Sequence, residues 1–90
     1  MLIEQVAERL QTKPEVLERE SLKLYLEKKL RVVESELFLL AHRYGVRDVA
    51  ELDGMVKQGK FHEDETFEDY FNFDYLEHER DKLLQLLGEP

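Results

Sequence analysis

The fold is decided by residues 14–44, which read PEVLERESLKLYLEKKLRVVESELFLLAHRY. Pro14 lacks an amide hydrogen and is tolerated in the first turn of a helix, and neither glycine nor proline recurs before Gly45. Glycine readily adopts the left-handed backbone that ends helices. The stretch therefore predicts one uninterrupted helix about 46 Å long, at about 1.5 Å per residue. A compact 90-residue chain has a radius of gyration of about 12 Å, so the molecule must be elongated.

Two apolar stripes run along this predicted helix. The first stripe, the seam, alternates spacings of four and three residues, which is typical of a left-handed coiled coil. Its members are Leu26, Leu30, Val33, Leu37, Leu40 and Tyr44. The second, the outer stripe, lies about 100° away and repeats every seven residues at Tyr25, Val32 and Leu39. One antiparallel helix cannot cover both stripes. We therefore expect a homodimer with Tyr25, Val32, Leu39 and the adjacent Phe38 in its interface, or another protein on this surface.

Two short helices are predicted on either side of the long one. Residues 2–11 carry apolar side chains at amphipathic spacing, and Thr12 with Glu15 has the pattern of a capping box for the long helix. Residues 48–58 begin with a second Asp-x-x-Glu capping box and end before Gly59.

A last helix is predicted over residues 64–87, and it carries a seam that matches the long helix. The seam consists of Phe73, Leu76, Leu83 and Leu87, with Arg80 in the remaining slot. Gly at 4 and Pro at 2 leave little material for a turn-rich β fold. We predict one all-α domain over residues 1–90, an elongated, antiparallel, coiled-coil-like helical hairpin of 14–44 and 64–87 with two short additional helices.

Charge is unevenly distributed along the chain. It has 13 Lys+Arg and 21 Asp+Glu, for a formal net charge of −8. Residues 1–31 carry six acidic and seven basic residues, whereas residues 61–81 carry nine acidic residues and a single base, Arg80. General nucleic-acid binding requires a basic face, so we do not expect a nucleic acid as the partner.

Aromatic side chains lie among the carboxylates of residues 61–81, the acidic aromatic segment. Aromatic anchors inside a charged rim are typical of protein interfaces. We expect a basic protein to bind this segment. The predicted contact residues are Glu63, Glu65, Phe67, Glu68, Asp69, Tyr70, Phe71 and Asp74. The alternative is that these aromatic residues pack in the core at the start of the last helix.

Several kinds of chemistry find no support in the sequence. With 0 Cys there is no disulfide, thiolate metal site or cysteine nucleophile. Asp74, His78 and Asp81 share one helix face, but no second helix offers the matching ligands, so we predict no metal and no cofactor. Ser21 has no plausible His and Asp partners, and no glycine-rich phosphate loop occurs. We predict that the protein is not an enzyme.

The expected location is the cytoplasm. No apolar run approaches the roughly 20 residues of a membrane span, and the opening MLIEQVAERL carries charges where a secretory signal is apolar. A content of 38 % charged residues with a single Asn also fits a heat-adapted source.

Residues 3–26 have the helix, turn and helix order of a DNA-binding helix-turn-helix. A basic stripe could support it, formed by Lys23, Lys28, Lys29 and Arg31. However, Glu15, Glu18 and Glu20 lie at the start of the second helix and would face phosphate. A DNA-binding regulator therefore stays an alternative.

Residues 12–87 contain a set of features shared with a known group of proteins. The features are a charged helix ending in Tyr44-Gly45, a short helix from Asp48-x-x-Glu51 to Lys57-x-Gly59-Lys60, the acidic aromatic segment and a Leu-rich last helix. In these features the chain resembles small helical antitoxin-like proteins of archaea and bacteria, commonly encoded beside toxin genes. The resemblance implies a partner protein that binds and neutralises a toxin, and nuclease toxins are commonly basic. The alternative is a homodimeric structural or scaffold protein.

Overall fold

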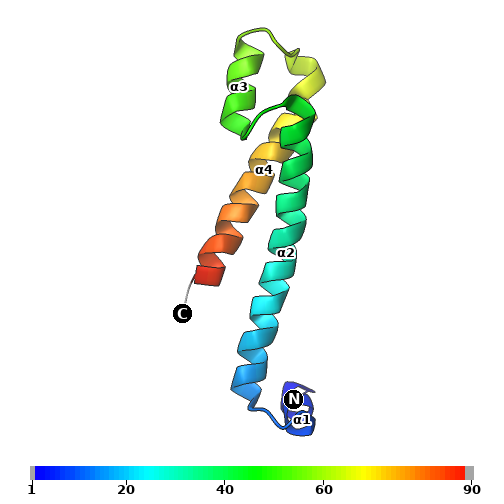
Figure 1. Cartoon of the computed structure of the whole chain (residues 1–90), viewed down its shortest axis with the longest axis vertical. Coiled ribbons are helices and arrows are strands. Elements are labelled where there is room, and N and C mark those ends of the chain that lie inside the picture. The colour runs from blue at the N-terminus through cyan, green and yellow to red at the C-terminus, as the bar shows by residue number, and fades with distance from the viewer. Residues whose placement is uncertain (1, 89–90) are drawn as a thin grey trace.

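The computed structural model describes residues 2–88, which form an elongated, all-helical molecule (Figure 1). Residues 1, 89 and 90 of the predicted domain lie outside this part. The molecule measures 61 × 21 × 18 Å, and the radius of gyration of its Cα atoms is 19.0 Å. A compact chain of this length would have a radius of about 12 Å. The predicted all-α and elongated character is confirmed.

Four helices occupy the described residues: α1 (Leu2–Arg9), α2 (Pro14–Tyr44), α3 (Val49–Lys57) and α4 (Glu63–Gly88). The bounds of α2 are those expected, and the ends of the other helices differ from the expected ones by at most two residues. Figure 1 shows α2 along the length of the molecule, with α1 at its N-terminal end and α3 at the other. α2 packs mainly against α4, which ends well before the N-terminal end of α2. We call the end where α2, α3 and α4 meet the tip.

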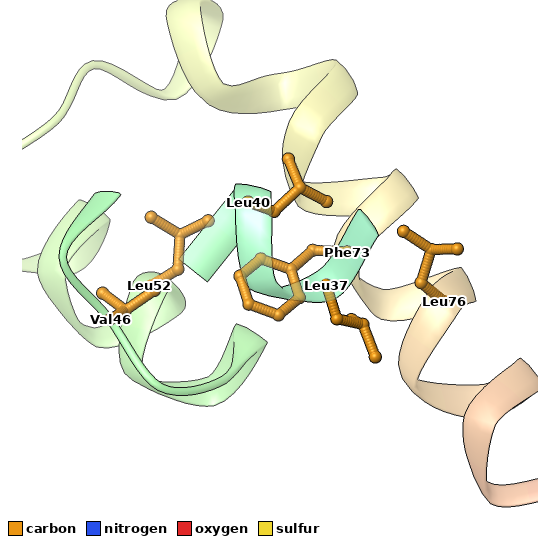
Figure 2. Packing of buried hydrophobic residues seen from close by; sticks show 6 residues of the cluster. All are labelled: Leu37, Leu40, Val46, Leu52, Phe73 and Leu76. Carbon is orange, nitrogen blue, oxygen red and sulfur yellow. The ribbon is translucent and has the colours of Figure 1, made fainter. Parts of the chain in front are cut away.

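The hydrophobic core lies at the tip (Figure 2). Six buried side chains form it: Leu37 and Leu40 of α2, Val46 of the following turn, Leu52 of α3, and Phe73 and Leu76 of α4. Phe73 and Leu52 are 1 % and 0 % exposed, and the ring of Phe73 lies in the middle of the cluster. Burying such a side chain contributes about 1.5–3 kcal/mol. Tertiary stabilisation is therefore concentrated at the tip.

The seam of α2 is its buried side. Outside the core cluster, the seam residues Leu26, Leu30, Val33 and Tyr44 are half-buried. On α4, Leu83 is buried and Leu87 is half-buried. The alternation of four and three residues thus identifies which side of each helix is covered.

Gly45 ends α2 as the sequence predicts. Its backbone is left-handed, with φ 66° and ψ 33°. The amide of Gly45 donates to the carbonyl of His42 at 3.3 Å, and the amide of Val46 donates to the carbonyl of Ala41 at 2.9 Å. These two bonds form a Schellman motif, which satisfies the last carbonyls of the helix and turns the chain towards α3.

The predicted capping box of Thr12 and Glu15 is wrong. The N-cap of α2 is Lys13, and no side chain caps it. Thr12 instead closes α1, because its amide donates to the carbonyl of Ala7 at 3.0 Å. Gln11, with φ 57°, takes the left-handed position of that turn. Thr12, which the sequence pattern predicts as the cap of α2, therefore belongs to the turn that ends α1.

The start of α3 is capped by two carboxylates, one from the residue that precedes the helix and one from α4. Asp48 accepts a hydrogen bond from the amide of Glu51 at 2.8 Å, as its capping box predicts. Glu51 does not reach back; its carboxylate binds Arg47 at 3.0 Å. Glu77 of α4 accepts the amide of Val49 at 2.9 Å instead. This contact joins α4 to the first turn of α3 and satisfies an amide that has no partner within α3.

Two glycine replacements test the helix ends. Gly45→Ala should lower the free energy of unfolding by about 1 kcal/mol, because a Cβ is strained at a left-handed φ. Gly54→Ala is the matched control, since Gly54 lies inside α3 and an added Cβ has nothing within 4 Å. It should raise the free energy of unfolding by about 0.5–1 kcal/mol. Urea unfolding at equilibrium measures both, and shifts of the same sign would contradict the prediction.

Candidate interaction surfaces

Two of the parts that expose large apolar side chains coincide with the predicted interaction surfaces. One part is the acidic aromatic segment, and the other is the outer stripe of α2, which borders the groove between α2 and α4. Among the described residues, the exposed fraction exceeds half for Phe67 and Phe71 of the first part and for Tyr25, Val32 and Leu39 of the second. Exposed apolar patches of this kind mark sites of protein association.

Phe67 and Phe71 form an exposed aromatic pair on α4. They are four residues apart and share one helix face, and each is 58 % exposed. Their ring centroids lie 5.0 Å apart with an interplanar angle of 68°. The ring of Tyr70 meets that of Phe71 edge to face at 5.5 Å, but Tyr70 is half-buried and packs against the core. Two of the three predicted aromatic anchors are therefore open to a partner.

A hollow of about 210 Å³ lies between this aromatic pair and α3. α4 contributes Glu63, Thr66, Phe67, Tyr70 and Phe71, and α3 contributes Asp53 and Val56. Small-molecule sites usually enclose about 300–1,000 Å³, so this hollow suits one side chain of a partner. Aromatic faces and carboxylates both attract a cation. The hollow therefore favours a positively charged side chain.

The carboxylates predicted to contact a partner are spread around α4. Glu63 lines the hollow, whereas Glu65, Glu68 and Asp69 lie on the other side of Phe67, around a second depression. Asp74 follows one turn further along, where its carbonyl oxygen lies 2.8 Å from Nδ1 of His78. That contact and the Asp74 carboxylate raise the pKa of His78. The structure thus surrounds Phe67 with carboxylates on both sides.

Asp69 has contacts within the molecule that the sequence does not reveal. Its Oδ2 accepts hydrogen bonds from the hydroxyl of Tyr44 at 2.5 Å and from Nη1 of Arg43 at 2.7 Å. The Tyr44 hydrogen bond, with that of Arg43, lowers the pKa of Asp69 against the opposing effect of burial. Burial and the bond to Asp69 raise the pKa of Tyr44. Asp69 therefore ties α4 to the end of α2.

The outer stripe of α2 lies uncovered along the molecule. Tyr25, Val32 and Leu39 are 58 %, 53 % and 62 % exposed. Tyr25 and Val32 border a groove of about 480 Å³ between α2 and α4, with Tyr75 on its opposite side. Phe38, the fourth predicted interface residue, lies about 100° round the helix from Leu39. Its ring stacks on His42, with centroids 6.1 Å apart.

Sequence reasoning missed the contributions of Asp53, Val56 and Tyr75. Asp53 and Val56 reach the hollow only because α3 folds back over the first turns of α4. No local pattern indicates that placement. Tyr75 belongs to the acidic aromatic segment, yet it lies beside the outer stripe. Tyr75 occupies a heptad position beside the seam of α4, and that position could have predicted its place at the edge of the groove.

The basic residues proposed for DNA binding are partly engaged with neighbours on α2. Nζ of Lys23 lies 4.0 Å from the carboxylate of Glu27, and Nζ of Lys29 lies 5.4 Å from the centroid of the Tyr25 ring.

The structure also bears on metal binding and membrane insertion. Within residues 2–88, no group of three His, Asp or Glu side chains could hold a metal ion. In the same part of the chain, every helix is too short or too polar to cross a membrane.

Comparison with known proteins identifies a family. The model of the Uncharacterized protein MJ0235 family matches residues 1–89. Searches of curated proteins and of solved structures gave no match.

The link between Tyr44 and Asp69 predicts a pH-dependent contribution to stability. A carboxylate with a lowered pKa stabilises the fold above its usual pKa of about 4 and loses this contribution as the pH falls through the lowered value. Tyr44→Phe should lower the free energy of unfolding by about 1 kcal/mol at pH 7. The difference from the unmodified protein should shrink towards pH 2.

Urea unfolding at the two pH values measures this effect, and Tyr25→Phe is the control because Tyr25 is exposed. NMR titration should show the pKa of Asp69 rising in Tyr44→Phe. An unchanged Asp69 titration in that variant would refute the assignment.

Proposed function

The chain belongs to the Uncharacterized protein MJ0235 family, and we propose that it is a non-enzymatic interaction module that binds a basic protein at its tip. The observation that carries the proposal is the hollow of about 210 Å³ beside Phe67 and Phe71. Three aromatic rings and two carboxylates line it, and both α3 and α4 contribute. Such a site fits an arginine or lysine side chain of the partner.

The two carboxylates of the hollow differ in how they are neutralised. Asp53 binds Nζ of Lys57 at 2.9 Å, and that lysine side chain is 76 % exposed. Within the described residues Glu63 has no ion pair, so its charge remains available to a partner. A cation over an aromatic ring gains about 0.5–2 kcal/mol, and more when water is excluded. An inserted guanidinium would therefore meet Glu63 and the faces of the rings together.

The wider acidic aromatic segment adds long-range attraction. Nine acidic residues and one basic residue over 61–81 give this segment a negative field, and Arg43, Arg47 and Lys57 of the tip are each paired with a carboxylate. Such fields steer an oppositely charged partner and raise the association rate at low salt, while buried aromatic anchors carry most of the affinity. In this proposal the carboxylates determine how fast the complex forms, and Phe67 and Phe71 determine how long it lasts.

The rest of the fold serves as a support for the tip. α2 and α4 act as an antiparallel, coiled-coil-like hairpin, and the contacts of Asp69 and Glu77 hold α3 and α4 in place. A neutralising, antitoxin-like role suits such a surface, because an acidic aromatic face can mask the cationic surface of a nuclease toxin. A homodimeric scaffold is a second candidate, supported by the exposed outer stripe.

The first experiment is co-expression with the product of the neighbouring gene, followed by co-purification. Phe67→Ala and Phe71→Ala should each speed dissociation of that complex about 30-fold, which corresponds to about 2 kcal/mol for an interface anchor. Phe38→Ala removes an exposed ring of α2 that does not line the hollow and should leave dissociation unchanged. Surface plasmon resonance measures the rates.

Charge removal should change the other rate. The combined replacement of Asp64→Asn, Glu65→Gln and Glu68→Gln should slow association and flatten its salt dependence, with little effect on dissociation. A peptide of alternating arginine and alanine should bind the tip, and its citrulline counterpart should not. Failure to co-purify, together with equal binding of the two peptides, would refute the proposal and leave the scaffold.

A further inference from the structure

The outer stripe is complementary to a reversed copy of itself. We propose that two copies of the chain pack antiparallel along α2, with the two-fold axis beside Val32. This proposal concerns the side of α2 remote from the hollow, and it does not depend on the function proposed for the tip. The second copy would cover the stripe that α4 leaves exposed.

The spacing of the stripe fits this axis. Tyr25 precedes Val32 by seven residues, and Leu39 follows it by seven. In an antiparallel pair centred on Val32, the side chain of Val32 meets its own symmetry mate. Tyr25 of each copy then lies level with Leu39 of the other, so that a ring covers an aliphatic side chain at both ends. An isologous contact of this kind needs such a self-complementary surface.

The charges beside the stripe select the antiparallel orientation. Lys28 and Lys29 lie four and three residues before Val32, and Glu36 lies four residues after it. Antiparallel pairing brings Glu36 of one copy level with the two lysines of the other, twice by symmetry. A parallel pairing in register would place Lys28 against Lys28 and Glu36 against Glu36. Opposed like charges disfavour that orientation.

The side chains of this surface are positioned for the contact. Nζ of Lys29 already lies over the ring of Tyr25, at 5.4 Å from its centroid, at the edge of the stripe. Among residues 2–88 no salt bridge involves Glu36, whose side chain is exposed. Each copy therefore offers a carboxylate without a salt bridge at the level where the other copy offers Lys28 and Lys29, of which Lys29 also attracts Glu79 of its own chain.

The extent of the contact predicts a weak dimer. With the axis at Val32, residues 20–44 of the two copies overlap over about 37 Å. A strip one helix wide, about 10–12 Å, projects to about 400 Å² per copy. Tyr75 on the far side of the groove widens the strip towards the roughly 600 Å² per copy at the lower end of specific interfaces. Dissociation in the micromolar range is expected.

Cysteine cross-linking tests the position of the axis, since the chain contains 0 Cys. Val32→Cys should oxidise rapidly to a disulfide-linked dimer, because at the axis the two Cα atoms come within the roughly 7 Å that a disulfide spans. Glu20→Cys, an exposed control on the same helix, should not, because its mate lies about 36 Å away. Tyr25→Cys and Leu39→Cys should cross-link only when mixed. Equal cross-linking by Glu20→Cys would overturn the axis.

Charge exchange tests the orientation, with sedimentation velocity as the readout. Glu36→Lys should weaken the dimer at least 10-fold. Adding Lys28→Glu and Lys29→Glu to that variant should restore it, because the opposite charges again face each other. Phe38→Ser should leave dimerisation unchanged, and so should Phe67→Ala at the tip. A monomer for the unmodified chain at about 100 µM, or no restoration by the exchange, would overturn the proposal and assign the stripe to another protein.

Discussion

A helix of 31 residues is longer than any other element of this chain can cover, and that length constrains everything packed around it. α4 lies along the seam of α2 but ends short of its N-terminal part, and α1 packs only at the far end. The remaining apolar surface of α2 is not covered by any other part of residues 2–88. The elongated shape follows from this mismatch in helix length, whereas the outer stripe is exposed because it lies about 100° round α2 from the seam that α4 covers.

Polar contacts at the tip make one end of this rod well defined. Asp69 joins α4 to the last turn of α2, and Glu77 joins α4 to the first turn of α3. Gly45 directs the chain between them. The Glu77 contact satisfies an amide of the first turn of α3, and the Asp69 contacts join side chains of α2 and α4. The hollow beside Phe67 is therefore formed before a partner arrives, which reduces the entropy lost on binding.

Periodicity predicted the parts of the structure that depend on local geometry. The seam, the Gly45 turn and the Asp48 cap follow from side-chain spacing and backbone preference. Thr12 was misassigned because two adjacent helix ends compete for it, and the pattern does not show which one prevails. Asp69 was expected to face a partner, yet Tyr44 and Arg43, more than twenty residues away, bind it. Asp53 enters the hollow only through the packing of α3. No local sequence pattern predicts contacts between residues this far apart in the chain.

Because the core lies at one end of the molecule, the free energy of local opening should differ between the two ends of α2. Amide hydrogens exchange through local openings, and these cost least where few side chains are buried. The N-terminal part of α2 that α4 does not reach packs only against α1 and should open without disturbing Phe73 or Leu52. One continuous helix would then contain two units with different opening free energies. A second copy on the outer stripe would slow amide exchange in the N-terminal part of α2 from residue 20 onward, whereas a protein bound at the tip would leave exchange there unchanged.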